Sequence, residues 1–234
     1  MASSDETPAP MPRSGGGSTE ATPGRAMGIG QKMMDKSAQM LQSLKAVRQT
    51  QQHVCTFSLY SHDFTRQIET HHYVTRLNQD FLQCPVFDSD SPNARLIGVE
   101  YIVSERIFEA LPPEEQMLWH SHAFEVHQIG SMDKSPCPWD DTKVELENLV
   151  KSYGKFWCTW QVDRGDPLPL GAPCLMMSPR SENFGMMKPE LIKIRDAKYG
   201  FSREEIKKSR AGIVEPDKTN PQADYWIRAG RGSL

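Results

Sequence analysis

The apolar and polar positions divide the chain into a polar start, an amphipathic segment and a long region of strand and helix patterns. The first 28 residues are rich in Pro, Gly, Ser and Thr and show no apolar periodicity. Such a composition cannot bury enough apolar surface to offset the entropy of ordering the segment. We therefore expect residues 1–28 to form a disordered tail.

Residues 29–52 have the spacing of an amphipathic helix. Apolar side chains recur at intervals of three, four and seven, and basic side chains lie between them. Two interpretations fit this pattern: the helix packs on its own domain, or it lies on a lipid surface with its lysines at the polar boundary. In the second case, the residues expected to contact lipid are Met33, Met40, Leu41, Leu44 and Lys45.

Residues 53–214 mix strand-like and helix-like segments. The stretches "HVCTFSLYSHDF", "RLIGVEYIVS" and "KFWCTWQVD" have strand periodicity, and residues 142–154 predict a helix that ends at Gly154. Strand–helix–strand units do not repeat, which favours an α+β fold. We expect a single compact domain with a mostly antiparallel sheet and flanking helices, followed by a loose tail over residues 215–234.

Composition excludes several classes of protein. The 27 Lys and Arg residues and 30 Asp and Glu residues give a net charge of −3, so no basic footprint for nucleic acid is expected. With a mean hydropathy of −0.58, no window approaches the run of roughly 18 apolar residues that a spanning helix needs. The N-terminal residues resemble neither a signal peptide nor a presequence, which predicts a cytoplasmic location.

The cysteines and the common enzyme motifs give little support for catalysis. Five scattered cysteines without a CxxC pair indicate reduced and mostly buried thiols. The chain has no GxGxxG, GxxxxGK, GxSxG or HExxH motif. The sequence therefore favours a non-enzymatic role and leaves the close histidine pairs as the candidates for any chemistry.

Two of these pairs occur, in "LWHSHAFEV" and "ETHHYVTR". If the first stretch is extended, His120 and His122 share one face at about 7 Å. If it is helical, His122 lies near Glu125 and His120 points away. In either case a third ligand must come from elsewhere in the chain: His62, His71 or His72.

These histidines have two interpretations. They could hydrogen-bond carboxylates and backbone groups in a polar seam, or they could hold a divalent metal such as Zn, Fe or Mn, because neutral imidazole is the commonest metal ligand. The expected ligands would be His71, His72, His120, His122 and Glu125. Because close imidazoles repel each other when protonated, we expect the pKa of one or more of them to lie below about 6.5.

Three long motifs are similar to segments of the oil body-associated protein family: "DSDSPNARLIGVEYIVS", "LWHSHAFEV" and "WQVDRGDPLPLG". The similarity extends over roughly residues 45–210. This resemblance implies association with lipid droplets, a part in their size or stability, and no transmembrane anchor. It implies no established reaction, and the candidate histidines and Glu125 match the family's pattern without an assigned role.

Two functions thus remain open for the chain. The first is a protein of the lipid droplet surface, in the cytoplasm and without nucleic-acid partners. The second is a small metal-dependent enzyme whose site is built from His71, His72, His120 and His122.

Overall fold

The computed structural model describes residues 25–128, 131–132, 146–180, 187–200, 208, 210, 212–213 and 219–229. Most of the predicted N-terminal tail, residues 1–24, lies outside the described residues. All statements about the structure below concern the described residues.

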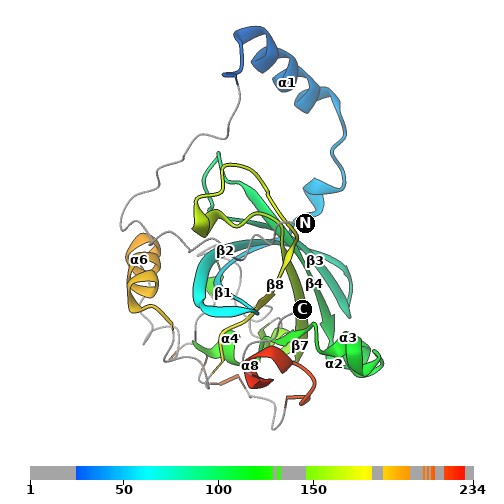
Figure 1. The fold of residues 1–234 in the computed structure, drawn as a ribbon. Coiled ribbons are helices and arrows are strands. Elements are labelled where there is room, and N and C mark those ends of the chain that lie inside the picture. Colours follow the sequence, from blue (N-terminus) through cyan, green and yellow to red (C-terminus); the bar gives the residue numbers. More distant parts are fainter. Residues whose placement is uncertain are drawn as a thin grey trace.

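The centre of the molecule is a closed barrel of six antiparallel strands (Figure 1). The barrel closes because β1 pairs with β2 on one side and with β8 on the other. In order around the barrel the strands are β1 (Gln52–Tyr60), β2 (Asp63–Asn78), β3 (Phe81–Phe87), β4 (Leu96–Ser104), β7 (Ser152–Cys158) and β8 (Cys174–Met177). The predicted α+β fold with an antiparallel sheet is confirmed, and closure into a barrel makes it more specific.

Two short strands add to this barrel. Strand β5 (His120–Ser121) pairs with β7, and β6 (Ser131–Met132) pairs with β1. Because side chains alternate along a strand, each long strand has one face toward the barrel interior and one face outside. The largest cluster of buried apolar residues takes side chains from all six barrel strands, among them Tyr60, Val74, Val86, Ile97, Phe156 and Met176.

Helices surround the barrel on several sides (Figure 1). They are α2 (Glu105–Glu109), α3 (Pro113–Gln116), α4 (Ala123–Gln128), a helix over 146–150, α6 (Pro189–Tyr199) and α8 (Tyr225–Ala229), with 3-10 turns η2 (Val47–Gln49) and η3 (Val162–Arg164). Helix α6 packs Leu191 and Ile192 against the outer side chains Phe57 and Leu59 of β1. Among the described helices, none is both long and apolar enough to span a membrane.

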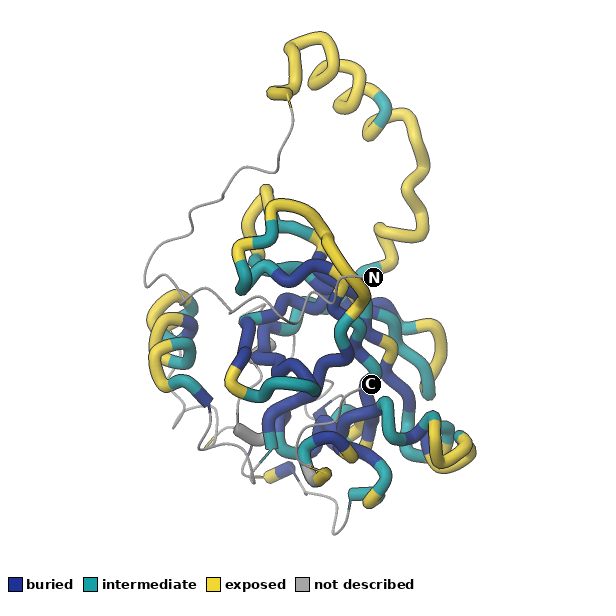
Figure 2. Tube along the Cα trace, viewed as in Figure 1, coloured by how far each residue is buried: buried dark blue, intermediate teal, exposed yellow. Residues whose placement is uncertain are grey.

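Helix α1 (Ile29–Leu41) stands away from the barrel (Figures 1 and 2). None of its residues is buried, and Met40 and Leu41 are 78% and 86% exposed. The interpretation that this helix packs on its own domain is therefore wrong for the described structure. The helix is also shorter than the predicted 29–52, since it ends at Leu41.

Two further expectations differ from the structure. The C-terminal segment is not a loose tail throughout, because Ala223, Asp224 and Trp226 are buried against the barrel. Gly154 does not end a helix: the helix covers 146–150, and Gly154 lies inside β7. A glycine is needed at this position of the strand because the side chains of Glu100, His120 and His122 pack against it.

Candidate functional site

A cavity of about 420 Å³ lies inside the barrel. Its wall combines apolar side chains with polar and charged ones. The apolar part includes Val54, Val74, Leu82, Ile102 and Leu149, and the polar part includes a group formed by Glu100, His72, His120 and His122. The cavity therefore offers both apolar surface and a convergent polar group, a combination that small-molecule sites use.

Glu100 is the centre of the polar group, which we call the Glu100 cluster (Glu100, His72, His120 and His122). Its Oε1 lies 3.0 Å from His120 Nε2 and 3.4 Å from His122 Nε2, and its Oε2 lies 2.7 Å from His72 Nδ1. All four side chains are buried. The expected convergence of the His120–His122 pair with a histidine from elsewhere is thus found, at His72.

The local fold explains how His120 and His122 reach the same carboxylate. His120 is in the two-residue strand β5, and α4 begins at Ala123, directly after His122. The chain is therefore neither fully extended nor helical here, and the two rings meet nearly at right angles with centroids 5.1 Å apart. Both sequence-based geometries for this stretch were incomplete.

Electrostatics within the cluster favour charged groups. Burial alone would raise the pKa of Glu100, but the charge of His72 and hydrogen bonds with all three histidines hold that pKa well below its usual value. Burial would lower the pKa of His122, but its hydrogen bond with Glu100 and the charges of Glu100 and Glu125 raise it. For His122 the direction is opposite to the expected lowering, because the nearby carboxylates outweigh repulsion between imidazoles.

Gly154 of β7 provides room for this arrangement. It is the strand partner of His120, and a Cβ atom at this position would overlap Glu100 Oε1 and lie 2.7 and 2.8 Å from His120 Nε2 and His122 Nε2. Real Cβ atoms do not approach other atoms so closely. One carboxylate oxygen and two imidazole nitrogens therefore converge on the space that a side chain at position 154 would fill.

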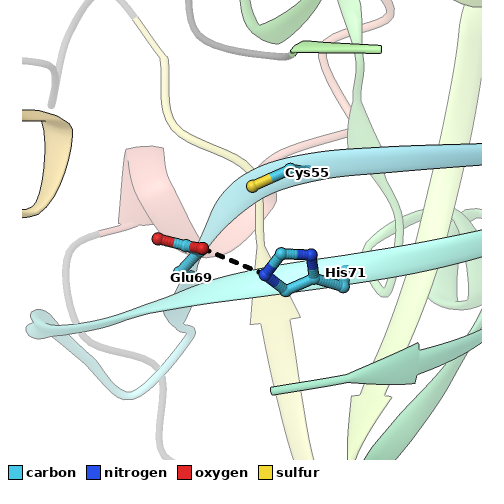
Figure 3. Close-up of side chains that lie close together, drawn as sticks. All are labelled: Cys55, Glu69 and His71. Carbon is cyan, nitrogen blue, oxygen red and sulfur yellow. Dashed lines mark hydrogen bonds and ion pairs between the residues drawn. The ribbon is translucent and has the colours of Figure 1, made fainter. Parts of the chain in front are cut away.

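His71 lies on the opposite face of β2 from His72, because neighbouring residues of a strand point to opposite sides. Its Nε2 is 3.0 Å from Glu69 and its Nδ1 is 2.9 Å from His53, while Cys55 lies close by (Figure 3). Burial and the Glu69 charge raise the pKa of the Cys55 thiol, which keeps it protonated. His71 thus belongs to a second group of side chains, in which both of its ring nitrogens already have partners.

Glu125 lines the same cavity but does not join the Glu100 cluster. It extends from α4, is buried, and accepts a hydrogen bond from Ser178 Oγ. His62 lies near the ring of Tyr60, at 5.7 Å between centroids.

The cysteine prediction is confirmed for the described residues, where Cys55, Cys84, Cys158 and Cys174 are free and three of them are buried.

Sequence reasoning missed Glu100, the residue on which the three histidines converge. A signal was present in "RLIGVEYIVS", because Glu100 shares the inward strand face with Gly98 and Ile102. A carboxylate in the middle of a buried strand face needs partners of opposite charge or hydrogen-bond donors. Which histidines supply them depends on the barrel closure, and periodicity does not show that.

The predicted lipid-contact residues lie outside this cavity. Met33, Met40 and Leu41 are exposed on α1, and Leu44 and Lys45 follow it in the segment leading to β1. Leu44 has a positive φ of 39°, so the helix cannot continue smoothly through this position. The five residues therefore belong to two consecutive segments rather than to one helix.

Comparisons with known proteins place these features in a family. A family model described as "Protein of unknown function (DUF1264)" matches residues 44–214. Oil body-associated protein 2A of Arabidopsis thaliana is 56% identical, covering 99% of this chain and 93% of that protein. The protein of the same name from Zea mays is 52% identical with the same shares covered.

The similarity extends to a second group of relatives. Oil body-associated protein 1B of Arabidopsis thaliana is 39% identical over 84% of this chain and 80% of that protein. No solved structure gives a significant match. From the length and identity of these matches, the chain belongs to the oil body-associated protein family.

Proposed function

We propose that this protein associates with the surface of lipid droplets through α1 and contributes to droplet size or stability. The observation that carries the proposal is the fully exposed apolar stripe of α1. The names of the relatives, oil body-associated proteins, support the same kind of surface.

The arrangement of side chains around α1 suits a lipid monolayer. At about 100° per residue, Ile29, Met33 and Met40 form one apolar row, and Met34 and Leu41 form a second. The small residues Gly30 and Ser37 lie between these rows, and Ala38 lies beside the second row. The apolar face is therefore continuous and has no charged residue.

The basic side chains of α1 lie at the edge of the apolar face, and its acidic side chain lies on the opposite side. Lys32 and Lys36 border the first apolar row, where their ammonium groups can reach phosphate head groups. Asp35, the acidic residue of this helix, lies on the opposite side and is hydrogen-bonded to Gln31. A lipid surface would thus meet apolar and basic side chains while the carboxylate faces water.

Energetics also favour a binding partner for α1. Isolated helices shorter than about 12–15 residues are marginal in water, and α1 has 13 residues. Burying its exposed apolar side chains would contribute about 25 cal/mol for each Å² removed from water. A monolayer can accept this face without any residue of the barrel being displaced.

The experiment replaces Met40, Leu41 and Leu44 with serine in the full chain fused to a fluorescent protein. We expect the variant to leave droplets for the surrounding medium, because most of the second half of the apolar stripe is lost. A matched control replaces Gln31, Asp35 and Gln39 on the polar face with serine and should keep droplet binding. Thermal unfolding of the barrel should stay the same in both variants, since none of these side chains is buried.

Two results would contradict this proposal. Droplet coating by the Met40, Leu41 and Leu44 variant would mean that another surface makes the attachment. Absence of the unmutated protein from droplets in droplet-rich cells would mean that the role named in the relatives does not extend to this chain.

A further inference from the structure

We infer that a divalent transition-metal ion binds in the barrel between Glu100 Oε1, His120 Nε2 and His122 Nε2, beside Gly154. This site goes beyond the droplet surface function and uses residues that do not contact α1. The spacing, the hydrogen bonding of His122 and the absent side chain at Gly154 support it independently.

The spacing of the three donor atoms fits a shared ion. Glu100 Oε1 lies 3.0 and 3.4 Å from the two Nε2 atoms. Ligand atoms about 2.1 Å from one ion lie about 3.0 Å apart in octahedral and about 3.4 Å apart in tetrahedral geometry. All three atoms lie within 4.8 Å of one another, so a small movement suffices for coordination.

The hydrogen bonding of His122 Nδ1 fixes the state of Nε2 in the neutral ring. Ser152 Oγ donates its single proton to the carbonyl of Leu149 at 2.7 Å. His122 Nδ1, at 2.9 Å from the same hydroxyl, must therefore be the donor in that contact. In the neutral ring, Nε2 then carries a lone pair that faces the Glu100 carboxylate.

A lone pair facing a carboxylate oxygen at 3.4 Å is repulsive unless a positive species separates them. That species is either a proton on His122 or a metal ion that both atoms ligate. The pattern of a ligating histidine whose other ring nitrogen donates to a neighbouring oxygen recurs at metal sites. Glu100 has a supporting partner too. Its other oxygen, Oε2, which does not contact His120 or His122, is bound by His72 Nδ1.

The glycine at position 154 favours a metal site over an ordinary ion pair. An ion pair between Glu100 and the histidines would form equally well with an alanine nearby if the side chains turned slightly. Here all three donor atoms point into the volume that a Cβ would occupy. The convergence of one carboxylate and two imidazoles on this space is the donor set of many Zn²⁺ and Fe²⁺ sites.

The cavity gives the ion access and further ligands. Three protein ligands leave at least one coordination position for water or a small molecule. His120 Nδ1 and Thr56 Oγ1 line the cavity and have no hydrogen-bond partner among the described residues. Buried polar atoms of this kind usually bond to a bound water or ligand.

The experiment titrates tag-free full-length protein, stripped with a chelator, with Co²⁺ at neutral pH, followed by competition with Zn²⁺. We expect one equivalent to bind, with visible absorption bands of Co²⁺ and a raised melting temperature. Glu100→Gln and Gly154→Ala should each weaken binding at least tenfold, because the first removes a ligand charge and the second fills the site. The matched control His71→Asn should bind like the unmutated protein, since His71 lies on the other face of β2.

Clear outcomes would overturn the inference. Failure of the unmutated protein to take up one equivalent of Co²⁺, Zn²⁺, Fe²⁺ or Mn²⁺ would leave His122 protonated in an ion pair. Binding lost in His71→Asn and kept in Glu100→Gln would place the ion beside His71, Glu69 and Cys55 instead. Circular dichroism of each variant checks folding, and the titration of the unmutated protein decides the question if a variant does not fold.

Discussion

Two glycines of the barrel, Gly98 and Gly154, leave space for different kinds of neighbouring atoms. At Gly98 of β4, a Cβ would overlap the carbonyl oxygen of Trp157 and lie 2.6 Å from the ring of Phe156. At Gly154, the atoms it would meet are the ends of side chains. Backbone of a paired strand cannot give way easily, whereas side chains can turn.

We therefore expect Gly98→Ala to destabilise the barrel by about 1–3 kcal/mol, the usual cost of overpacking. Gly154→Ala should cost less stability, because Glu100, His120 and His122 can move. Urea unfolding of both variants in the absence of metal measures the difference. Equal losses would show that Gly154 is needed for strand pairing rather than for the space beside the cluster.

Prediction from sequence succeeded for some residues at this scale and failed for others. The pair His120 and His122 could be singled out because the two residues are close in sequence. Glu100 and Gly154 could not be connected with them, because their contacts depend on the register of β4 with β7 and of β5 with β7. Register is set by long-range packing and not by local periodicity.

At the scale of elements, the C-terminal segment holds the strand that carries His120. Asp224 accepts a hydrogen bond from the backbone N–H of Ser121 at 3.1 Å and pairs with Arg180. Burial raises the pKa of Asp224 against the lowering effect of Arg180. The loop before α8 thus fixes β5 from the side opposite to β7.

Removing the guanidinium by Arg180→Met should destabilise the protein by about 3–5 kcal/mol, because the buried Asp224 carboxylate loses its charge partner. The double variant Arg180→Met with Asp224→Asn should recover part of that loss, since no uncompensated charge remains. Denaturant unfolding at neutral pH gives both values. If the double variant is no more stable than the single one, the charge of Asp224 does not cause the loss.

Helix α6 is tied to the loop before β4 by another carboxylate. Asp90 accepts hydrogen bonds from Lys198 Nζ at 2.7 Å and Tyr199 Oη at 2.8 Å. Burial would raise the pKa of Asp90, but these two bonds and the Lys198 charge lower it to about 2. A depressed carboxyl pKa stabilises the folded state above its usual value of 3.8, and this stabilisation is lost as the pH falls toward 2.

We expect the end of α6 to lose hydrogen-exchange protection between about pH 4 and pH 2, after correction for intrinsic rates. In Asp90→Asn, protection of α6 should be low already at neutral pH and should change little on acidification. A pH response in that variant equal to the response of the unmutated chain would assign the effect to another group.

Local patterns predicted the elements better than their ends. The predicted strand over "RLIGVEYIVS" is found, because its periodicity acts locally. Local signals also mark the ends of α6, with Pro189 at its start and Gly200 directly after its last residue. The tail after residue 215 looked loose because it has few apolar residues. Its order comes from Asp224 and Trp226, whose partners are distant in sequence.

For the whole molecule, the antiparallel α+β class followed from the sequence, but the closed barrel did not. Closure requires β1 to pair with β8, which lies more than 100 residues later. The same long-range arrangement leaves α1 without a place on the barrel (Figure 2). The amphipathic pattern alone therefore could not show that this stripe stays off the barrel.

The separation of α1 from the barrel has a consequence for crowding on a droplet. A helix of 13 residues lying flat covers about 200 Å² of surface, from a length of about 20 Å and a width of about 10 Å. A compact domain of about 180 residues has a cross-section of about 1,300 Å². The barrel of each anchored molecule would thus cover several times the area of lipid that its helix occupies. Binding to the droplet surface would become saturated when neighbouring barrels touch. On the proposed function, bare lipid would remain beneath a bulky coat, and that coat would hold neighbouring droplets apart.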